Sequence, residues 1–340
     1  MKSWIAEAAN RDEWLAQHIE ETIAPEMEIV DPHHHLWNRD GTAYELAGLW
    51  ADTGAGHNVV QTVFIECHSN YYADVEDGFA PVGETAYVAG QAALAARDTS
   101  KAQIAGIVAH VDLRRENLNE VLDAHGAVGG NLFKGIRHAL AWDENVGDLK
   151  IAPRGDKDIS IDPNFRRGMA ELGRRGLAYD TWHYHYQNKE FLALAQAVPE
   201  TTMVLDHFGT PLGVGRFAGK RDEIFAAWKD DIAALAECPN VVAKLGGMAM
   251  PDNGYGWHEQ GTPISSDEFV EAMAPWYHHT IECFGAQRCM FESNFPVDRA
   301  AISYNVLWNG LKKLAAPYSA MDQARMFAGT ARDVYQLAGR

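Results

Sequence analysis

The sequence has few cysteines, and none of them lies in a paired motif. Cys67, Cys238, Cys283 and Cys289 are spread over 340 residues with no CxxC spacing. This spacing excludes a disulfide-dense secreted scaffold. It is typical of a protein from a reducing compartment, so we expect a cytoplasmic location.

The sequence also lacks an excess of positive charge. It contains 29 Lys and Arg against 47 Asp and Glu, which gives a formal net charge of −18. Nucleic acids and anionic membranes bind basic surfaces, so neither is expected as a partner. An anionic small molecule remains compatible with this charge if a pocket gathers local positive groups.

Long apolar runs and nucleotide-binding loops are absent too. No stretch approaches the roughly 18 apolar residues of a membrane span. The acidic, amphipathic residues 1–27 do not have the pattern of a signal peptide. No GxGxxG or GxxxxGK[ST] motif follows the first predicted strand, which disfavours a nucleotide-binding fold.

Eight apolar, β-branched runs alternate with helical patterns along the chain. Runs such as "TVFI" and "MVL" are apolar on both faces, as in parallel strands covered by helices. The "DP" at 162–163 predicts a helix start. We expect an α/β fold, a (β/α)₈ TIM barrel. The predicted strands cover residues 27–32, 59–67, 103–112, 132–140, 176–182, 201–209, 240–247 and 288–294.

The barrel is expected to form one domain over residues 27–340, preceded by an N-terminal helical extension over residues 1–26. Three long connections, 38–58, 139–162 and 248–265, each follow a predicted strand. In a barrel of this kind such βα loops form the rim at which active sites lie.

Polar and titratable side chains gather at the predicted strand ends. In "IVDPHHHLW" (29–37), alternation places His33 and His35 on one face and His34 on the other. Each residue taken singly has an ordinary structural explanation, but their coincidence at one rim predicts an active site. The further strand-end candidates are Glu66, Cys67, His68, Lys134, Arg137, His138, Asp180, Trp182, His183, His185, Asp206, His207, Lys244, Glu292, Asn294 and Asp298.

Six segments in this order resemble the amidohydrolase-related branch of the amidohydrolase superfamily, whose characterised members include sugar lactonases and 2-pyrone-4,6-dicarboxylate lactonase. The segments are "DPHHHLW", "GIRHALAWD", "YDTWHYHYQ", "VLDHFGTPLGVG", "VVAKLGGMAMP" and "CMFESNFPVD". The resemblance covers nearly the whole chain. It is specific for the branch and not for one substrate.

The resemblance implies a barrel whose site lies at the strand C-termini, and it assigns roles to several histidines. The first-strand HxH maps onto His33 and His35, and the histidine of the "DHxG" pattern maps onto His207. The fifth-strand histidine maps best onto His185. The resemblance implies that His33, His35 and His185 are the ligands of one divalent metal ion, zinc or manganese, and a metal-independent site is the alternative.

The remaining predicted site residues bind substrate or handle protons. "GIRH" makes Arg137 and His138 candidates to bind or polarise a carbonyl or carboxylate. The superfamily's catalytic eighth-strand Asp is replaced by Asn294, which cannot take a proton near neutral pH. The base is then Asp298, Glu292 or a histidine, or the reaction needs no strong base. The other expected substrate-binding residues are Trp37, Glu66, Lys134, Asp180 and Trp182.

The favoured function is hydrolysis of a cyclic ester of a carboxylated or hydroxylated small molecule, with Arg137, a histidine or a metal stabilising the oxyanion. Two alternatives stay open. One is a metal-dependent decarboxylase of an aromatic or pyrone acid, and the other is a barrel that binds a ligand without turnover. A homodimer is common for such barrels, but nothing in the sequence requires one.

Overall fold

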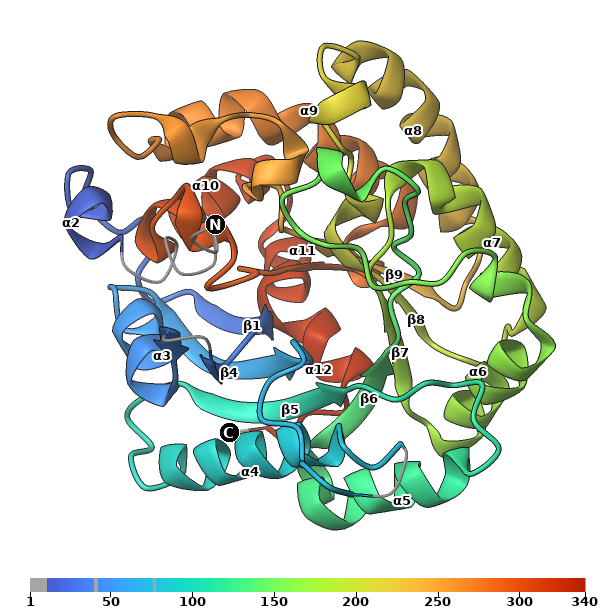
Figure 1. Cartoon of the computed structure of the whole chain (residues 1–340). Helices are drawn as coiled ribbons and strands as arrows, with labels where there is room; N and C mark the ends of the chain where they lie inside the picture. Colours follow the sequence, from blue (N-terminus) through green and yellow to red (C-terminus); the bar gives the residue numbers. More distant parts are fainter. Residues whose placement is uncertain (1–10, 40–41, 76–77, 340) are drawn as a thin grey trace.

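The computed structural model describes residues 11–39, 42–75 and 78–339, and its centre is a barrel of eight parallel strands surrounded by helices (Figure 1). The strands pair in chain order, which confirms the predicted (β/α)₈ barrel. They are β1 (Glu28–His34), β4 (Asn58–Ile65), β5 (Gln103–Ala109), β6 (Phe133–Arg137), β7 (Ala178–Thr181), β8 (Met203–Leu205), β9 (Val241–Leu245) and β10 (Cys289–Phe291).

Buried polar contacts join the first strand to the segment after the last. His34 forms a parallel bridge with Phe295, and the His35 backbone N–H donates to the Phe295 carbonyl at 2.8 Å. The carboxylate of Asp31 accepts hydrogen bonds from the Ser293 hydroxyl at 2.6 Å and the Tyr304 hydroxyl at 2.9 Å. These contacts bring the ends of β1 and β10 together, so residues of both strands can share one site.

Helices cover the outer face of the barrel (Figure 1). Local sequence explains their limits: α6 begins at Pro163 because Asp162 caps it by accepting from the Asn164 N–H, and it ends before Gly176 at φ 68°. The helices are α3 (Leu46–Thr53), α4 (Val82–Ala95), α5 (Leu118–Gly129), α6 (Pro163–Arg175), α7 (Asn188–Ala197), α8 (Arg221–Ala236), α9 (Ser266–Phe284), α10 (Tyr304–Ala315), α11 (Ala320–Ala324) and α12 (Thr330–Val334).

Apolar strand residues and the C-terminal segment fill the end of the barrel away from the loops that follow the strands. Val63, Val108 and Val204 belong to one buried cluster with Ala331 and Tyr335. The segment after α12 therefore closes the end of the barrel at which the strands begin. It places the hydroxyl group of Tyr335 inside that end.

Two predicted strands are shorter than expected because the backbone turns sharply after them. The strand expected over 201–209 is β8 (Met203–Leu205), and the short helix η5 (Asp206–Gly209) follows it, with His207 at φ 54°. Asn294, after β10, is likewise at φ 54°. Left-handed backbone at a residue other than glycine is uncommon and often marks a functional position.

The loop expected at 38–58 contains regular structure. It holds the antiparallel pair of β2 (Trp37–Arg39) and β3 (Thr42–Tyr44), followed by α3. Within the expected extension 1–26, residues 1–10 lie outside the described residues, and α2 (Asp12–Leu15) is the helix described there. In the described part of the chain, no helix has the length and apolar character needed to cross a membrane.

Candidate active site

A pocket of about 80 Å³ lies at the strand C-termini. Its lining residues are His35, Trp37, Cys67, Arg137, Ile151, Arg154, Trp182, His207, Met250, Asn294 and Val297. A larger cavity of about 340 Å³ lies among residues at the strand N-termini, including Ala178 and Val242, and no histidine lines it. The smaller pocket is the candidate site because titratable groups from several strands converge there.

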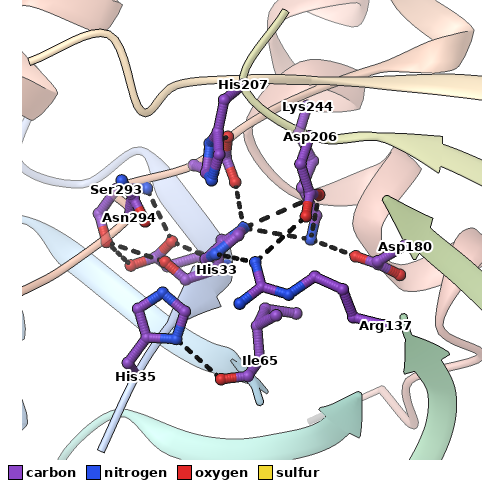
Figure 2. A network of polar contacts seen from close by, with 12 residues as sticks. His33, His35, Ile65, Arg137, Asp180, Asp206, His207, Lys244, Ser293 and Asn294 are labelled. Atoms are coloured by element: carbon purple, nitrogen blue, oxygen red, sulfur yellow. Dashed lines mark hydrogen bonds and ion pairs between the residues drawn. The ribbon is translucent and has the colours of Figure 1, made fainter. Parts of the chain in front are cut away.

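The histidines of β1 divide as the alternation predicted. His34 turns away and contacts the Thr62 hydroxyl through Nε2 at 3.0 Å. His33 and His35 turn to the barrel centre, with ring centroids 5.0 Å apart. Nδ1 of His35 donates to the Ile65 carbonyl at 2.8 Å, which leaves Nε2 available as an acceptor on the pocket side (Figure 2). Burial lowers the pKa of His35 well below its ordinary value, so this imidazole is neutral.

Glu292, just after β10, orients two imidazoles at once. One carboxylate oxygen lies 2.7 Å from Nδ1 of His33, and the other lies 2.7 Å from Nδ1 of His207. The contact with His207 is a hydrogen bond, so Nδ1 of His207 carries a proton, whereas the contact with His33 is a close approach of the two side chains. Nε2 of His207 is then left for the pocket that His207 lines.

The same carboxylate changes the proton affinity of His207. Burial alone would lower the pKa of His207, but the nearby Glu292 carboxylate outweighs burial and raises it. The pKa of His33 shifts the other way, because burial lowers it well below its ordinary value and the Lys244 ammonium lowers it further. The two imidazoles that share Glu292 are therefore a basic one at the pocket and a neutral one beneath it.

Arg137 is held by several partners at the end of β6. Nε donates to the Glu66 carboxylate at 2.8 Å, and one terminal nitrogen donates to the Glu66 carbonyl at 2.6 Å. The other terminal nitrogen lies 3.4 Å from Nε2 of His33 and 3.4 Å from Asp206 (Figure 2). Arg137 is thus a fixed positive charge on the pocket floor.

Beneath the pocket, Lys244 of β9 joins two carboxylates. Its Nζ lies 2.5 Å from Asp180 and 3.3 Å from Asp206 (Figure 2). Tyr335 donates to the same Asp180 oxygen at 2.7 Å. None of these side chains lines the pocket, so they set the electrostatic environment of the residues above.

Asn294 faces the pocket, and Asp298 stands behind it. The Asn294 amide donates to Asp298 at 2.8 Å, and the Ala249 N–H donates to the other Asp298 oxygen at 3.0 Å. Burial raises the pKa of Asp298 to about 7. Asp298 is buried and is not among the pocket residues, so its contact with the site runs through Asn294.

The structure brings some predicted residues to the pocket and leaves others outside it. Trp37 and Trp182 line it, while Glu66 and Asp180 lie beneath it. Lys134 does not reach it, because it lies near the start of β6 and its ammonium donates to the Gln336 carbonyl.

His138 also turns away from the pocket. Its Nδ1 accepts from the Leu113 N–H at 3.3 Å, and its ring packs against Phe165. It is not among the pocket residues. Of the two predicted basic residues of "GIRH", the structure therefore places only Arg137 in the pocket.

His185, expected with His33 and His35, lies in a different place. It begins the short helix η4 (His185–Gln187), accepts from the Leu212 N–H through Nδ1 at 3.2 Å, and packs against Phe217. His183 contacts Asn188 at 2.9 Å instead. Neither residue lines the pocket, because β7 ends at Thr181 and the chain turns into η4 at His185.

Arg154 is a pocket residue that the sequence did not single out. It comes from the long loop after β6 and pairs with Glu66 at 3.5 Å. A single arginine in an irregular loop has no periodicity or motif to mark it. Only the folded loop shows that two arginines, Arg137 and Arg154, share the pocket.

A group that could hold a metal ion exists, with a different membership from the one expected. Among the described residues, His33, Asp206 and His207 offer ligand atoms within 4.8 Å of one another, and Glu66, His68 and His110 form a second such group. Two imidazoles with a carboxylate are a typical zinc donor set. However, Asp206 already faces both Lys244 and Arg137, so in this arrangement a divalent ion would lie against two buried cations.

Comparisons with known proteins agree with the fold and the motifs. The family model described as amidohydrolase matches residues 30–337. An L-fucono-1,5-lactonase of Burkholderia multivorans is 27% identical over 311 residues, covering 91% of this chain and 96% of that protein. An uncharacterised protein of Sinorhizobium fredii, y4mH, is 28% identical over 334 residues, covering 92% and 99%.

Solved structures show the same fold. A crystal structure of an amidohydrolase from Burkholderia multivorans with bound zinc superposes with a TM-score of 0.72 at 23% identity, covering 91% of this chain and 99% of that one. A structure described as a 2-pyrone-4,6-dicarboxylic acid hydrolase from Pseudomonas putida has a TM-score of 0.62 at 16% identity, covering 92% and 99%.

Proposed function

The chain belongs to the amidohydrolase family, and on that premise we propose that it hydrolyses the lactone of a carboxylated or hydroxylated small molecule. The observation that carries the proposal is the pair of His207 and Glu292, joined at 2.7 Å beside a fixed arginine in the pocket. The sequence similarity to a relative that is named as a lactonase supports the same class of reaction.

His207 is the proposed general base. Glu292 holds its Nδ1 proton, so Nε2 can take a proton from the attacking water. The same nitrogen then returns that proton to the ring oxygen as the ester bond breaks. The products are an open-chain carboxylate and an alcohol, and the proton that the new acid releases goes to solvent. This assignment gives the site a base although Asn294 stands where the superfamily has an aspartate.

The lactone carbonyl is proposed to face Arg137. A guanidinium fixed in a desolvated pocket stabilises the negative charge that develops on the carbonyl oxygen. Trp182 also lines the pocket, and its buried indole N–H has no hydrogen-bond partner among the described residues, so a substrate oxygen could accept from it.

Arg154 favours a carboxylate on the substrate. Besides Arg137, at the end of β6, it is the other permanently charged residue among those lining the pocket, and it comes from the loop that follows β6. Arginine matches a planar carboxylate with two parallel donors. The acidic protein surface does not oppose such a substrate, because the residues that line the pocket include two arginines and no carboxylate.

Zinc is the ion to test first in this protein. A structural neighbour contains it, and imidazole donors suit zinc better than manganese. Since Lys244 and Arg137 oppose a divalent ion beside His33 and Asp206, the steps above use only the residues of the chain.

A panel of lactones with and without carboxylate groups tests the function, with acid release followed at constant pH. We expect ring opening of at least one carboxylated lactone, and a fall of about 10²-fold or more in kcat/KM for His207→Gln. His278→Gln, on the outer helix α9, is the matched control and should keep full activity. Release of carbon dioxide without a ring-opened acid would show a decarboxylase, and binding without product would show a ligand-binding barrel; either contradicts the proposal.

A further inference from the structure

The ammonium of Lys244 occupies a position in the barrel centre that resembles that of a bound cation. Lys244 is fully buried. Its Nζ lies 2.5 Å from Asp180, 3.3 Å from Asp206 and 3.5 Å from Nδ1 of His33 (Figure 2). Asp206 and His33 are two of the three residues that could hold a metal ion there.

Arg137 covers the other side of the same two residues. It lies 3.4 Å from the second oxygen of Asp206 and 3.4 Å from Nε2 of His33. Both polar edges of the carboxylate and both nitrogens of the imidazole therefore face a positive charge. An ion that approached either ring nitrogen of His33 would therefore meet Lys244 on one side or Arg137 on the other.

A divalent ion could join this group only by displacing one of these cations. Zinc bound to His33 and Asp206 would lie about 2.0–2.2 Å from each ligand atom. That position is within a few ångströms of Lys244 Nζ, which contacts the same two residues. In a buried site the repulsion between the two charges is weakly screened.

We propose that Lys244 is a built-in cation that replaces a divalent metal ion at the barrel centre and positions Asp206 and His33 beneath the pocket. Tyr335 contributes by fixing Asp180, the carboxylate nearest the ammonium. Lys244 is not among the residues that line the pocket, so it is a positioning residue. The proposal concerns the site of the proposed hydrolysis, but metal binding tests it whether or not the substrate is known.

Removal of the ammonium should create a metal site. In Lys244→Met, the Asp180 and Asp206 carboxylates lose their cation while His33 and His207 remain. We expect Co²⁺, followed by its visible absorption and by calorimetry, to bind Lys244→Met at least tenfold more tightly than the wild type. Co²⁺ should also raise the melting temperature of Lys244→Met and leave that of the wild type unchanged, because an ion that binds only the folded state stabilises it.

Two control variants distinguish the loss of the buried charge at position 244 from other effects of replacing a lysine. Lys134→Met removes a lysine from the opposite end of the barrel and should bind Co²⁺ as the wild type does. Lys244→Arg keeps the charge and should also remain without a tight site. A Lys244→Met protein that folds only when Co²⁺ or Zn²⁺ is supplied supports the proposal in the same way.

Several outcomes would overturn it. One is an unchanged Co²⁺ affinity in Lys244→Met, and another is an equal gain in Lys244→Arg. A third is stoichiometric, tight Co²⁺ binding by the wild type that is lost in His33→Asn. Failure of the lactone panel would contradict the proposed function and leave these binding results valid, so the two failures are distinguishable.

Discussion

Two pairs of histidines lie at strand ends of the same barrel and differ in the groups that they contact. His33, near the end of β1, and His207, just after β8, each lie 2.7 Å from the carboxylate of Glu292. His183 and His185, after β7, contact the side-chain amide of Asn188 and the backbone N–H of Leu212. Burial lowers the pKa of His183 and of His185 to about 4, whereas the pKa of His207 is raised.

The difference shows what makes a buried imidazole reactive in this protein. A strand-end position alone supplies burial, and burial favours the neutral ring. The Glu292 carboxylate outweighs burial at His207 and raises its pKa, whereas at His33 burial and the Lys244 ammonium keep the pKa low despite the same carboxylate. The histidines after β7 have amide partners, so they stabilise the turn in which they lie. His207, beside Glu292, is the imidazole suited to accept a proton.

Glu292→Gln should have the largest effect on this contrast. The amide keeps the size of the side chain, but it no longer favours a positive charge on His207 and can present the wrong hydrogen-bonding group to Nδ1. We expect kcat to fall by about 10²–10⁴-fold with KM little changed, as for other histidine bases that lose their carboxylate. Steady-state kinetics measure this, and a loss below tenfold would mean that the carboxylate does not activate His207.

Arg154→Met should have an intermediate effect, because it removes a charge from the pocket and leaves the histidine pair intact. A lost charge-assisted contact is equivalent to about 1.5–3 kcal/mol, or roughly 10–100-fold in binding. We expect KM for a carboxylated lactone to rise by that factor and kcat to change less. An uncharged lactone is the control substrate, and an equal rise in its KM would argue against carboxylate recognition.

His185→Gln should have the smallest effect. The change removes the acceptor of the Leu212 N–H and a ring that packs on Phe217. We expect the free energy of unfolding to fall by about 1 kcal/mol in a urea titration, and kcat/KM to stay within about threefold. A tenfold loss of kcat/KM would show that His185 takes part in catalysis, and it would contradict the difference drawn between the two pairs of histidines.

The sequence predicted the barrel and half of the histidine arrangement because both follow from periodicity. Strand alternation correctly separated His34 from His33 and His35, and the order of strands placed β1 beside β10. The destination of His185 could not be predicted, since it depends on where a strand gives way to a 3₁₀ turn.

Residues that act through long-range contacts were also beyond the sequence. Glu292 could be recognised as a candidate base, but its two imidazole partners are 85 and 259 positions away along the chain. Arg154 lies in an irregular loop. The role of Lys244 becomes visible only from its contacts with Asp180 and Asp206 in the folded barrel. Pairings of this kind are set by closure of the barrel and leave no local pattern.

The contact between Tyr335 and Asp180 has a consequence for the order in which the site can be assembled during synthesis. Asp180 emerges from the ribosome about midway through translation, but its hydrogen-bond partner is 155 residues further along the chain. The buried charges beneath the pocket are therefore completed only when the segment after α12 has been made. A chain that ends before that segment would lack the hydroxyl that donates to Asp180.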